Sequence, residues 1–225
     1  MVTRIANEMN LALQSGRGCL DLMIFDLDGT LVNSFDLFIS VYNSLAKRHC
    51  IKSLSMGDIE RLRYLSPREI MKWAGMPYWR LPWIARDFVR LMSQRQNEMR
   101  LFDGVERVLY ELHEQCIQLA VVSSNSLENC QRMLGADICS RMDCIEGGAP
   151  LFGKHRRIQR VLTTLGVQPN RAMYVGDQLS DADAARAAGV RFGAVSWGYG
   201  APEALARQRP DIMFSSIEDI SLLTG

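Results

Sequence analysis

Two aspartates stand at the end of an apolar run near the start of the chain. Leu22 to Phe25 has the pattern of a strand buried on both faces, and Asp26 and Asp28 follow it. Because side chains two apart on a strand point to the same side, we expect the two carboxylates to share a face. At about 5 Å and an effective dielectric of about 20, their repulsion is roughly 3 kcal/mol.

This pair of carboxylates has three possible roles. A hard cation such as Mg²⁺ would remove the repulsion by binding to them. Alternatively, one carboxylate holds a proton, and the pair divides into a base and an acid. The third possibility is a polar strand end whose aspartates only support a turn.

Three later segments carry polar residues that suit phosphate chemistry. Ser123 and Ser124 end a second apolar run and lead into a helix, so a hydroxyl and the following backbone N–H groups can bind an anion. Lys154 lies just before another helix, and Asp177 and Asp181 follow a third apolar run. Taken singly, each has an ordinary interpretation: a helix-capping turn, a surface lysine and a turn aspartate.

The elements that must position these residues alternate between strand and helix from residue 101 onward. This order predicts an α/β fold, a Rossmann-like parallel sheet core with helices on both faces. We expect strands over 117–122, 143–146, 171–175 and 191–197, and helices over 101–114 (with Asp103 as N-cap), 126–134, 156–165 and 181–188.

Residues 36–100 interrupt this pattern and predict helices only. Apolar spacing indicates helices over 36–48, 55–63 and 84–99. Ser66 is a predicted N-cap, with Pro67 at the first helical position, Glu69 completing a capping box and Gly75 ending the helix. We therefore divide the chain into an α/β core, residues 1–35 and 101–225, and an inserted all-helical cap, residues 36–100. Residues 1–18 are an N-terminal extension to which we assign no function.

Composition is ordinary for a globular protein and excludes several classes. The 225 residues are 48% hydrophobic and 23% charged, and the net charge of +1 gives no reason to expect nucleic acid or an anionic membrane as partner. The six cysteines include no C-x-x-C pair and no histidine at zinc-site spacing. We expect reduced cysteines in a cytoplasmic monomer or homodimer, with neither signal peptide nor membrane span.

The first acidic segment resembles a known signature. Its sequence, Asp26-Leu-Asp28-Gly29-Thr30-Leu31-Val32-x-Ser34, is similar to the first motif of the haloacid dehalogenase-like phosphatase superfamily. The helical-capped branch with phosphoglycolate phosphatase and β-phosphoglucomutase is the most similar. The later segments follow in the family's order, at separations of 97, 31 and 23 residues between Asp26, Ser123, Lys154 and Asp177.

The resemblance implies a role for each matching residue. Asp26 would be the nucleophile that forms an aspartyl-phosphate, and Asp28 the general acid and base. Mg²⁺ would be bound by Asp26, Asp177 and the backbone carbonyl of Asp28, with Asp181 as an indirect or occasional ligand. The residues implied in binding the phosphoryl group are Gly29, Thr30, Ser123, Ser124 and Lys154. An acid at position 28 favours phosphate esters over carbon–halogen bonds, because a halide leaves without a proton.

The helical insertion should choose the substrate, a small phosphorylated metabolite. Residues 60–100 carry nine basic and four acidic residues, a net charge of +5. Arg63 and Arg68 flank a loop whose counterpart in resembling enzymes reaches the active site, so either could form a fork with a carboxylate such as that of phosphoglycolate. The alternative is a solvated basic face. We expect the aromatic side chains of this segment in the interior of the cap or against the core: Trp73, Tyr78, Trp79 and Trp83.

Three other functions share parts of this pattern. A receiver-type signalling domain also combines aspartates, a hydroxyl and a lysine, but it is about half this length and has no helical insertion. A non-catalytic phospho-ligand-binding protein should lack one of the four segments, and none is missing here. A sugar-phosphate phosphomutase uses the same residues and stays open as an alternative to the phosphatase.

Overall fold

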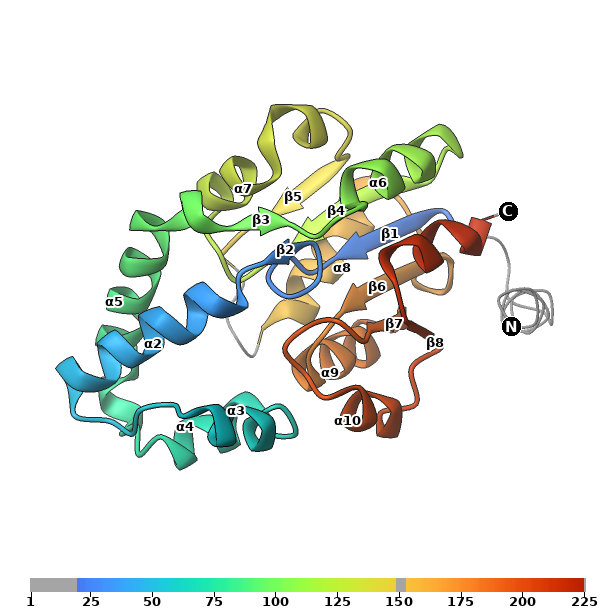
Figure 1. The fold of residues 1–225 in the computed structure, drawn as a ribbon. Coiled ribbons are helices and arrows are strands. Elements are labelled where there is room, and N and C mark those ends of the chain that lie inside the picture. The colour runs from blue at the N-terminus through green and yellow to red at the C-terminus, as the bar shows by residue number, and fades with distance from the viewer. Residues whose placement is uncertain (1–19, 149–152, 225) are drawn as a thin grey trace.

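The computed structural model describes residues 20–148 and 153–224, so the predicted extension 1–18 lies outside the described residues. Within them, six strands form one parallel sheet in the order β5-β4-β1-β6-β7-β8 (Figure 1). The strands are β1 (Leu22–Phe25), β4 (Gln118–Val122), β5 (Cys144–Glu146), β6 (Ala172–Gly176), β7 (Arg191–Val195) and β8 (Ile212–Phe214). The predicted α/β fold with a parallel sheet is confirmed.

Helices cover both faces of the sheet, which explains why β1 is apolar at every position. Met23 and Phe25 pack into one apolar layer, and Leu22 and Ile24 into the other. The first layer includes side chains of α6 (Val105–Glu114), α7 (Leu127–Cys139) and the 3₁₀ segment η4 (Ile217–Thr224). The second includes side chains of α8 (Lys154–Leu165), α9 (Leu179–Ala188) and α10 (Pro202–Arg207).

Two short strands mark where the chain leaves and rejoins the sheet layer. β2 (Val32–Asn33) pairs antiparallel with β3 (Arg100–Leu101). Between them lie α2 (Phe35–His49), α3 (Met56–Leu62), α4 (Pro67–Trp73), η1 (Tyr78–Arg80), α5 (Leu81–Gln94) and η2 (Gln96–Glu98). We call residues 34–99 the helical insert. Figure 1 shows it beyond the end of the sheet toward which β1 and β6 point. No helix in the described part of the chain is both long and apolar enough to cross a membrane.

The predicted caps of α4 are confirmed. The Ser66 hydroxyl accepts from the Glu69 backbone N–H, and the Glu69 carboxylate accepts from the Ser66 N–H. Such caps typically contribute about 1 kcal/mol, because they satisfy N–H groups that the helix leaves unpaired. Gly75, with a φ of 67°, follows the helix in the left-handed conformation.

Several element boundaries differ from the prediction. Helix α5 runs from Leu81 to Gln94. It can begin before Pro82 because a proline in the first turn, where the N–H has no partner in the helix, costs nothing. Asp103 is not the N-cap of α6; that position belongs to Gly104, whose φ is 88°. The sequence patterns did not predict β2, β3, α10, β8 or η4, all of them eight residues or shorter.

The expected burial of the aromatic residues in the insert is largely wrong. Tyr78 and Trp79 are each 72% exposed, and Trp83 is 53% exposed. Trp73 alone of this set packs against a small apolar cluster within the insert. Apolar spacing predicted the helices but could not predict which of their faces another element would cover.

Candidate active site

Strand register brings three predicted site residues to one edge of the sheet. Phe25, the last residue of β1, pairs with Val121 of β4 on one side and with Val175 of β6 on the other. Asp26 follows β1, Ser123 follows β4 and Asp177 follows β6. They therefore meet at the carboxyl ends of the central strands, where the strand order reverses and where open α/β sheets bind their ligands.

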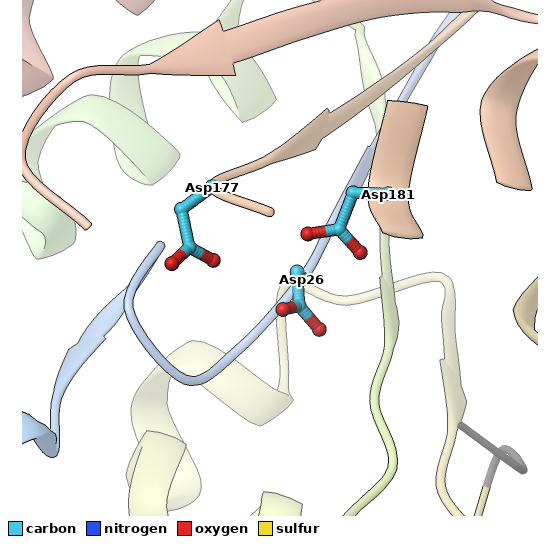
Figure 2. A group of neighbouring side chains, drawn as sticks. All are labelled: Asp26, Asp177 and Asp181. Carbon is cyan, nitrogen blue, oxygen red and sulfur yellow. The ribbon is translucent and has the colours of Figure 1, made fainter. Parts of the chain in front are cut away.

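A buried cluster of three carboxylates lies at this edge. Oxygens of Asp26, Asp177 and Asp181 lie within 4.8 Å of one another, and all three residues are buried (Figure 2). Burial raises the pKa of Asp26 to about 7 and holds the pKa of Asp177 well above its usual range, and the neighbouring carboxylates act in the same direction. Hard oxygen donors crowded in this way suit a divalent cation such as Mg²⁺, which would offset their repulsion.

Lys154 lies inside the molecule, in contact with this cluster. It is the first residue of α8, and its Nζ lies 2.8 Å from Asp26 Oδ1 and 2.7 Å from Asp181 Oδ1. The Tyr174 hydroxyl lies 3.3 Å from the Val122 carbonyl oxygen and 3.4 Å from Asp181 Oδ1. Asp181 therefore holds the lysine against Asp26, a contact that sequence spacing did not predict.

Asp28 has partners of its own. The Ser34 hydroxyl donates to its Oδ1 at 2.7 Å, and the Asn125 amide donates to its Oδ2 at 2.5 Å. Burial raises the pKa of the Asp28 carboxyl. Among the described residues, the carboxylate cluster includes Asp26 but not the Asp28 side chain. Asp28 lies three residues beyond the end of β1, and there its carboxylate bonds to Ser34 and Asn125.

Gly29 and Thr30, predicted to bind phosphate, both contact Asp177. Thr30 Oγ1 donates to Asp177 Oδ1 at 3.2 Å. Gly29 has a φ of +80°, and a Cβ there would lie 2.4 Å from Asp177 Oδ2. Only glycine therefore permits the close approach of this turn to the carboxylate.

The two serines after β4 differ in environment. Ser123 is buried, and its Oγ accepts from the Asn125 backbone N–H at 3.1 Å, whereas Ser124 is exposed. Ser126 then caps α7 by accepting from Asn129 N. The predicted strand–turn–helix arrangement is present, with Ser123 at the sheet edge.

A loop that sequence reasoning missed encloses Asp177 from the other side. The Tyr199 backbone N–H donates to Asp177 Oδ2 at 2.6 Å, and the Gly200 N–H donates to the Asp177 carbonyl at 3.1 Å. A Cβ on Gly198 would lie 2.2 Å from Asp177 Cβ. The signal was available, because Gly198-Tyr199-Gly200 directly follows a predicted strand and so belongs to the same edge of the sheet.

Arg63 contacts this loop rather than an open pocket. Its guanidinium donates to the carbonyls of Gly198, Tyr199 and Gly200, at 3.2, 3.1 and 3.3 Å. These donors hold the helical insert to the core, a contact that neither alternative for Arg63, the fork with a substrate carboxylate or the solvated basic face, had included. Arg68 is exposed near the start of α4.

Comparison with known proteins identifies the class. The family model of haloacid dehalogenase-like hydrolases matches residues 23–195. The chain is 30% identical over 202 residues to a phosphoglycolate phosphatase of Synechococcus elongatus, covering 89% of this chain and 95% of the relative. It is 23% identical to a pyrophosphatase, PpaX, of Bacillus pumilus, covering 92% and 97%.

Solved structures show the same fold. A haloacid dehalogenase-like family protein from Streptococcus pneumoniae superposes with a TM-score of 0.76 at 23% identity, covering 89% of this chain and 96% of that one. CbbY from Rhodobacter sphaeroides, solved in complex with phosphate, superposes with a TM-score of 0.70 at 20% identity, covering 89% and 96%.

The chain belongs to the haloacid dehalogenase-like hydrolase family. It is an enzyme of the phosphatase type in that family, as its sequence predicted. This membership argues against the receiver-domain alternative.

Proposed function

We propose that this protein is a cytoplasmic, Mg²⁺-dependent phosphatase that hydrolyses a small phosphorylated metabolite, similar to phosphoglycolate, through an aspartyl-phosphate at Asp26. The observation that carries the proposal is the different environment of two neighbouring carboxylates. Asp26 lies 2.8 Å from the buried Lys154 ammonium and within the acidic cluster, whereas Asp28 is held by two neutral donors. A nucleophile and a proton carrier need this separation of roles.

The reaction proceeds in two displacements. An Asp26 oxygen attacks phosphorus in line, the bond from phosphorus to the leaving oxygen breaks, and Asp28 gives its proton to that oxygen. Asp28 then takes a proton from water, whose oxygen attacks the aspartyl-phosphate and releases inorganic phosphate and free Asp26. The raised pKa of Asp28 favours the protonated form that the first displacement requires.

Fixed charges around Asp26 stabilise the transferring phosphoryl group. Lys154 supplies a buried cation, and the hydroxyl of Ser123 and the N–H groups of the following turn supply neutral donors. Asp26, Asp177 and the Asp28 carbonyl would hold Mg²⁺, with Asp181 binding Lys154. When bound, the ion would neutralise charge on the phosphoryl oxygens and the carboxylates.

The helical insert corresponds to the predicted cap, residues 36–100, which in this proposal lies over a core of residues 1–35 and 101–225. Its place beyond the strand ends would shield the phosphoryl group from bulk water. We propose Arg68 as the contact for a substrate carboxylate. Inorganic pyrophosphate is a second candidate substrate, because several relatives at 23–24% identity are named pyrophosphatases.

The test is release of phosphate from a panel of compounds with Mg²⁺. The panel contains phosphoglycolate, sugar phosphates, nucleoside monophosphates and pyrophosphate. Asp26→Asn should abolish release, and EDTA should do so in the wild type. The matched control is Asp183→Asn on α9, because Asp183 is 74% exposed and lies outside the acidic cluster; it should retain wild-type rates.

Each other outcome identifies a different function. Conversion of one sugar phosphate into another without free phosphate, followed by ³¹P NMR, would establish the phosphomutase. Binding of a phosphorylated compound without any conversion, with Mg²⁺ or Mn²⁺, would indicate a non-catalytic binding protein. Full activity of Asp26→Asn would refute the assigned nucleophile.

A further inference from the structure

Tyr199 lies where the helical insert, the β2 segment and the acidic cluster meet. Its ring packs against Phe35 and Phe38 of α2, with centroids 5.2 and 5.7 Å apart. Its backbone N–H donates to Asp177 Oδ2. One residue of the core therefore contacts both the first helix of the insert and a carboxylate of the site.

The Tyr199 hydroxyl reaches Asp28 through one intermediate. It lies 2.5 Å from Ser34 Oγ, and Ser34 Oγ lies 2.7 Å from Asp28 Oδ1. When Asp28 is ionised its carboxylate can only accept, so in that state Ser34 donates its single proton to Asp28 Oδ1. The Tyr199 hydroxyl must then donate to Ser34, which fixes the rotation of the serine hydroxyl and aims it at the carboxylate.

The loop that carries Tyr199 is attached to the insert by a second contact. Arg63, which follows α3, donates to three successive carbonyls of residues 198–200, and its own carbonyl accepts from Ala201 N at 2.9 Å. Arg63 thus bonds to each residue of the segment 198–201 and attaches this loop to the insert. The backbone on both sides of Tyr199 is therefore bonded to a residue of the insert.

We propose that Tyr199 is a positioning residue that holds Asp28, through Ser34, in the orientation required for proton transfer to the leaving group. Arg63 links this function to the seating of the insert on loop 198–200. The inference rests on the proposed phosphatase function. It adds that the proton-transfer geometry depends on a side chain that reaches Asp28 through Ser34.

A comparison of leaving groups separates positioning from general support of the fold. An alkyl phosphate releases an alcohol that must receive a proton as its bond breaks, whereas p-nitrophenyl phosphate releases a phenolate that leaves unprotonated. We therefore compare kcat/KM for the best alkyl substrate and for p-nitrophenyl phosphate, since this quantity reports the first displacement. Tyr199→Phe keeps the ring against Phe35 and Phe38 and removes only the hydroxyl.

Tyr199→Phe should lower kcat/KM for the alkyl substrate about tenfold more than for p-nitrophenyl phosphate. General acids contribute about a hundredfold or more, and misplacing Asp28 should remove only part of that contribution. Arg63→Lys should move the same ratio in the same direction, because the single ammonium nitrogen lacks the planar fork by which Nε and Nη2 of the guanidinium bond to the three carbonyls. The control is Tyr42→Phe, which removes a hydroxyl bonded to the Lys52 carbonyl inside the insert; it should leave the ratio unchanged.

The route through Ser34 is tested by a double-mutant cycle. In a Ser34→Ala background, Tyr199→Phe should have no further effect on the ratio. The inference would be overturned if Tyr199→Phe changed the ratio of the two kcat/KM values less than threefold, or if the effects in the cycle were additive. Hydrolysis of both substrates by the wild type would still support the phosphatase function in that case. Hydrolysis of neither substrate by the wild type would instead refute the proposed function, and this inference with it. Activity toward p-nitrophenyl phosphate also serves as the check that each variant is folded.

Discussion

Replacing Lys154 with methionine should destabilise the protein strongly, since it leaves a buried pair of carboxylates without their cation. The side chains of Lys154, Asp26 and Asp181 are 7%, 5% and 0% exposed, and the ammonium lies 2.7–2.8 Å from both acids. At that distance and an effective dielectric of about 20, each attraction is about 6 kcal/mol. Desolvation offsets much of this, and removal of one partner from a buried pair typically costs about 3–5 kcal/mol.

The measurement is urea unfolding in EDTA at pH 7.5, followed by tryptophan fluorescence. With a slope of about 2 kcal/mol per molar, a loss of about 4 kcal/mol moves the midpoint by about 2 M. The control, Lys72→Met at an exposed position of α4, should change stability by less than about 0.5 kcal/mol. The double variant Lys154→Met with Asp181→Asn should regain at least half of the loss, because one of the two uncompensated charges is gone.

The defect of Lys154→Met should also depend on pH. Burial raises the pKa of Asp26 even with the lysine present, and loss of the ammonium raises it further. At pH 5 Asp26 is protonated in both folded proteins, so the defect should be smaller. At pH 8 the wild type ionises Asp26 beside the ammonium and the variant lacks that stabilisation, so the defect should be larger. A loss below 1 kcal/mol at pH 7.5, or an equal loss at pH 5 and pH 8, would refute the conclusion that electrostatic compensation is the main contribution of Lys154 to stability.

Three further outcomes follow from the geometry of the site and surface. In EDTA, the thermal stability of the wild type should fall from pH 5 to pH 8. The reason is that folded Asp26 has a pKa of about 7, against 3.8 for an ordinary aspartate, and so keeps a proton that the unfolded chain releases. Mg²⁺ should reverse most of this fall. Gly198→Ala should reduce kcat at least tenfold by displacing Asp177, whereas Gly57→Ala, which has open space around it in α3, should be neutral or slightly stabilising; equal activities would contradict this. Trp79→Ala, at a position 72% exposed, should change the unfolding free energy by no more than about 0.5 kcal/mol, and a loss above 2 kcal/mol in urea would show that the residue is covered.

The sequence predicted those features that depend on local chemistry. The capping residues of α4 predicted its start and end, and the apolar runs before Asp26, Ser123 and Asp177 predicted the strands that bring these residues to one edge. Parallel strands have their carboxyl ends at the same edge, so adjacency followed from topology alone.

Features that depend on contacts between distant segments could not be predicted in the same way. The resemblance implied a lysine that neutralises the nucleophile, and Lys154 contacts Asp26. Nothing indicated that it would also contact Asp181, or that the Arg63 guanidinium would bind backbone carbonyls. The outward-facing Tyr78 and Trp79 show the same limit for burial. A side chain's type and period describe what it can contact, but its partner is set by the packing of whole elements.

The pairing of β2 with β3 has a consequence for how such enzymes diversify. Val32 faces Leu101 and Asn33 faces Arg100, so the chain departs and returns at adjacent positions of one small ribbon. We expect the intervening helices to be exchangeable as a cassette, because a replacement needs only ends spaced like two neighbouring strands. A chimera that carries a foreign cassette between residues 33 and 100 should keep the Asp26-dependent turnover of p-nitrophenyl phosphate and change its preference among natural esters. Loss of all turnover in a folded chimera would show that the cassette and the catalytic machinery cannot be separated.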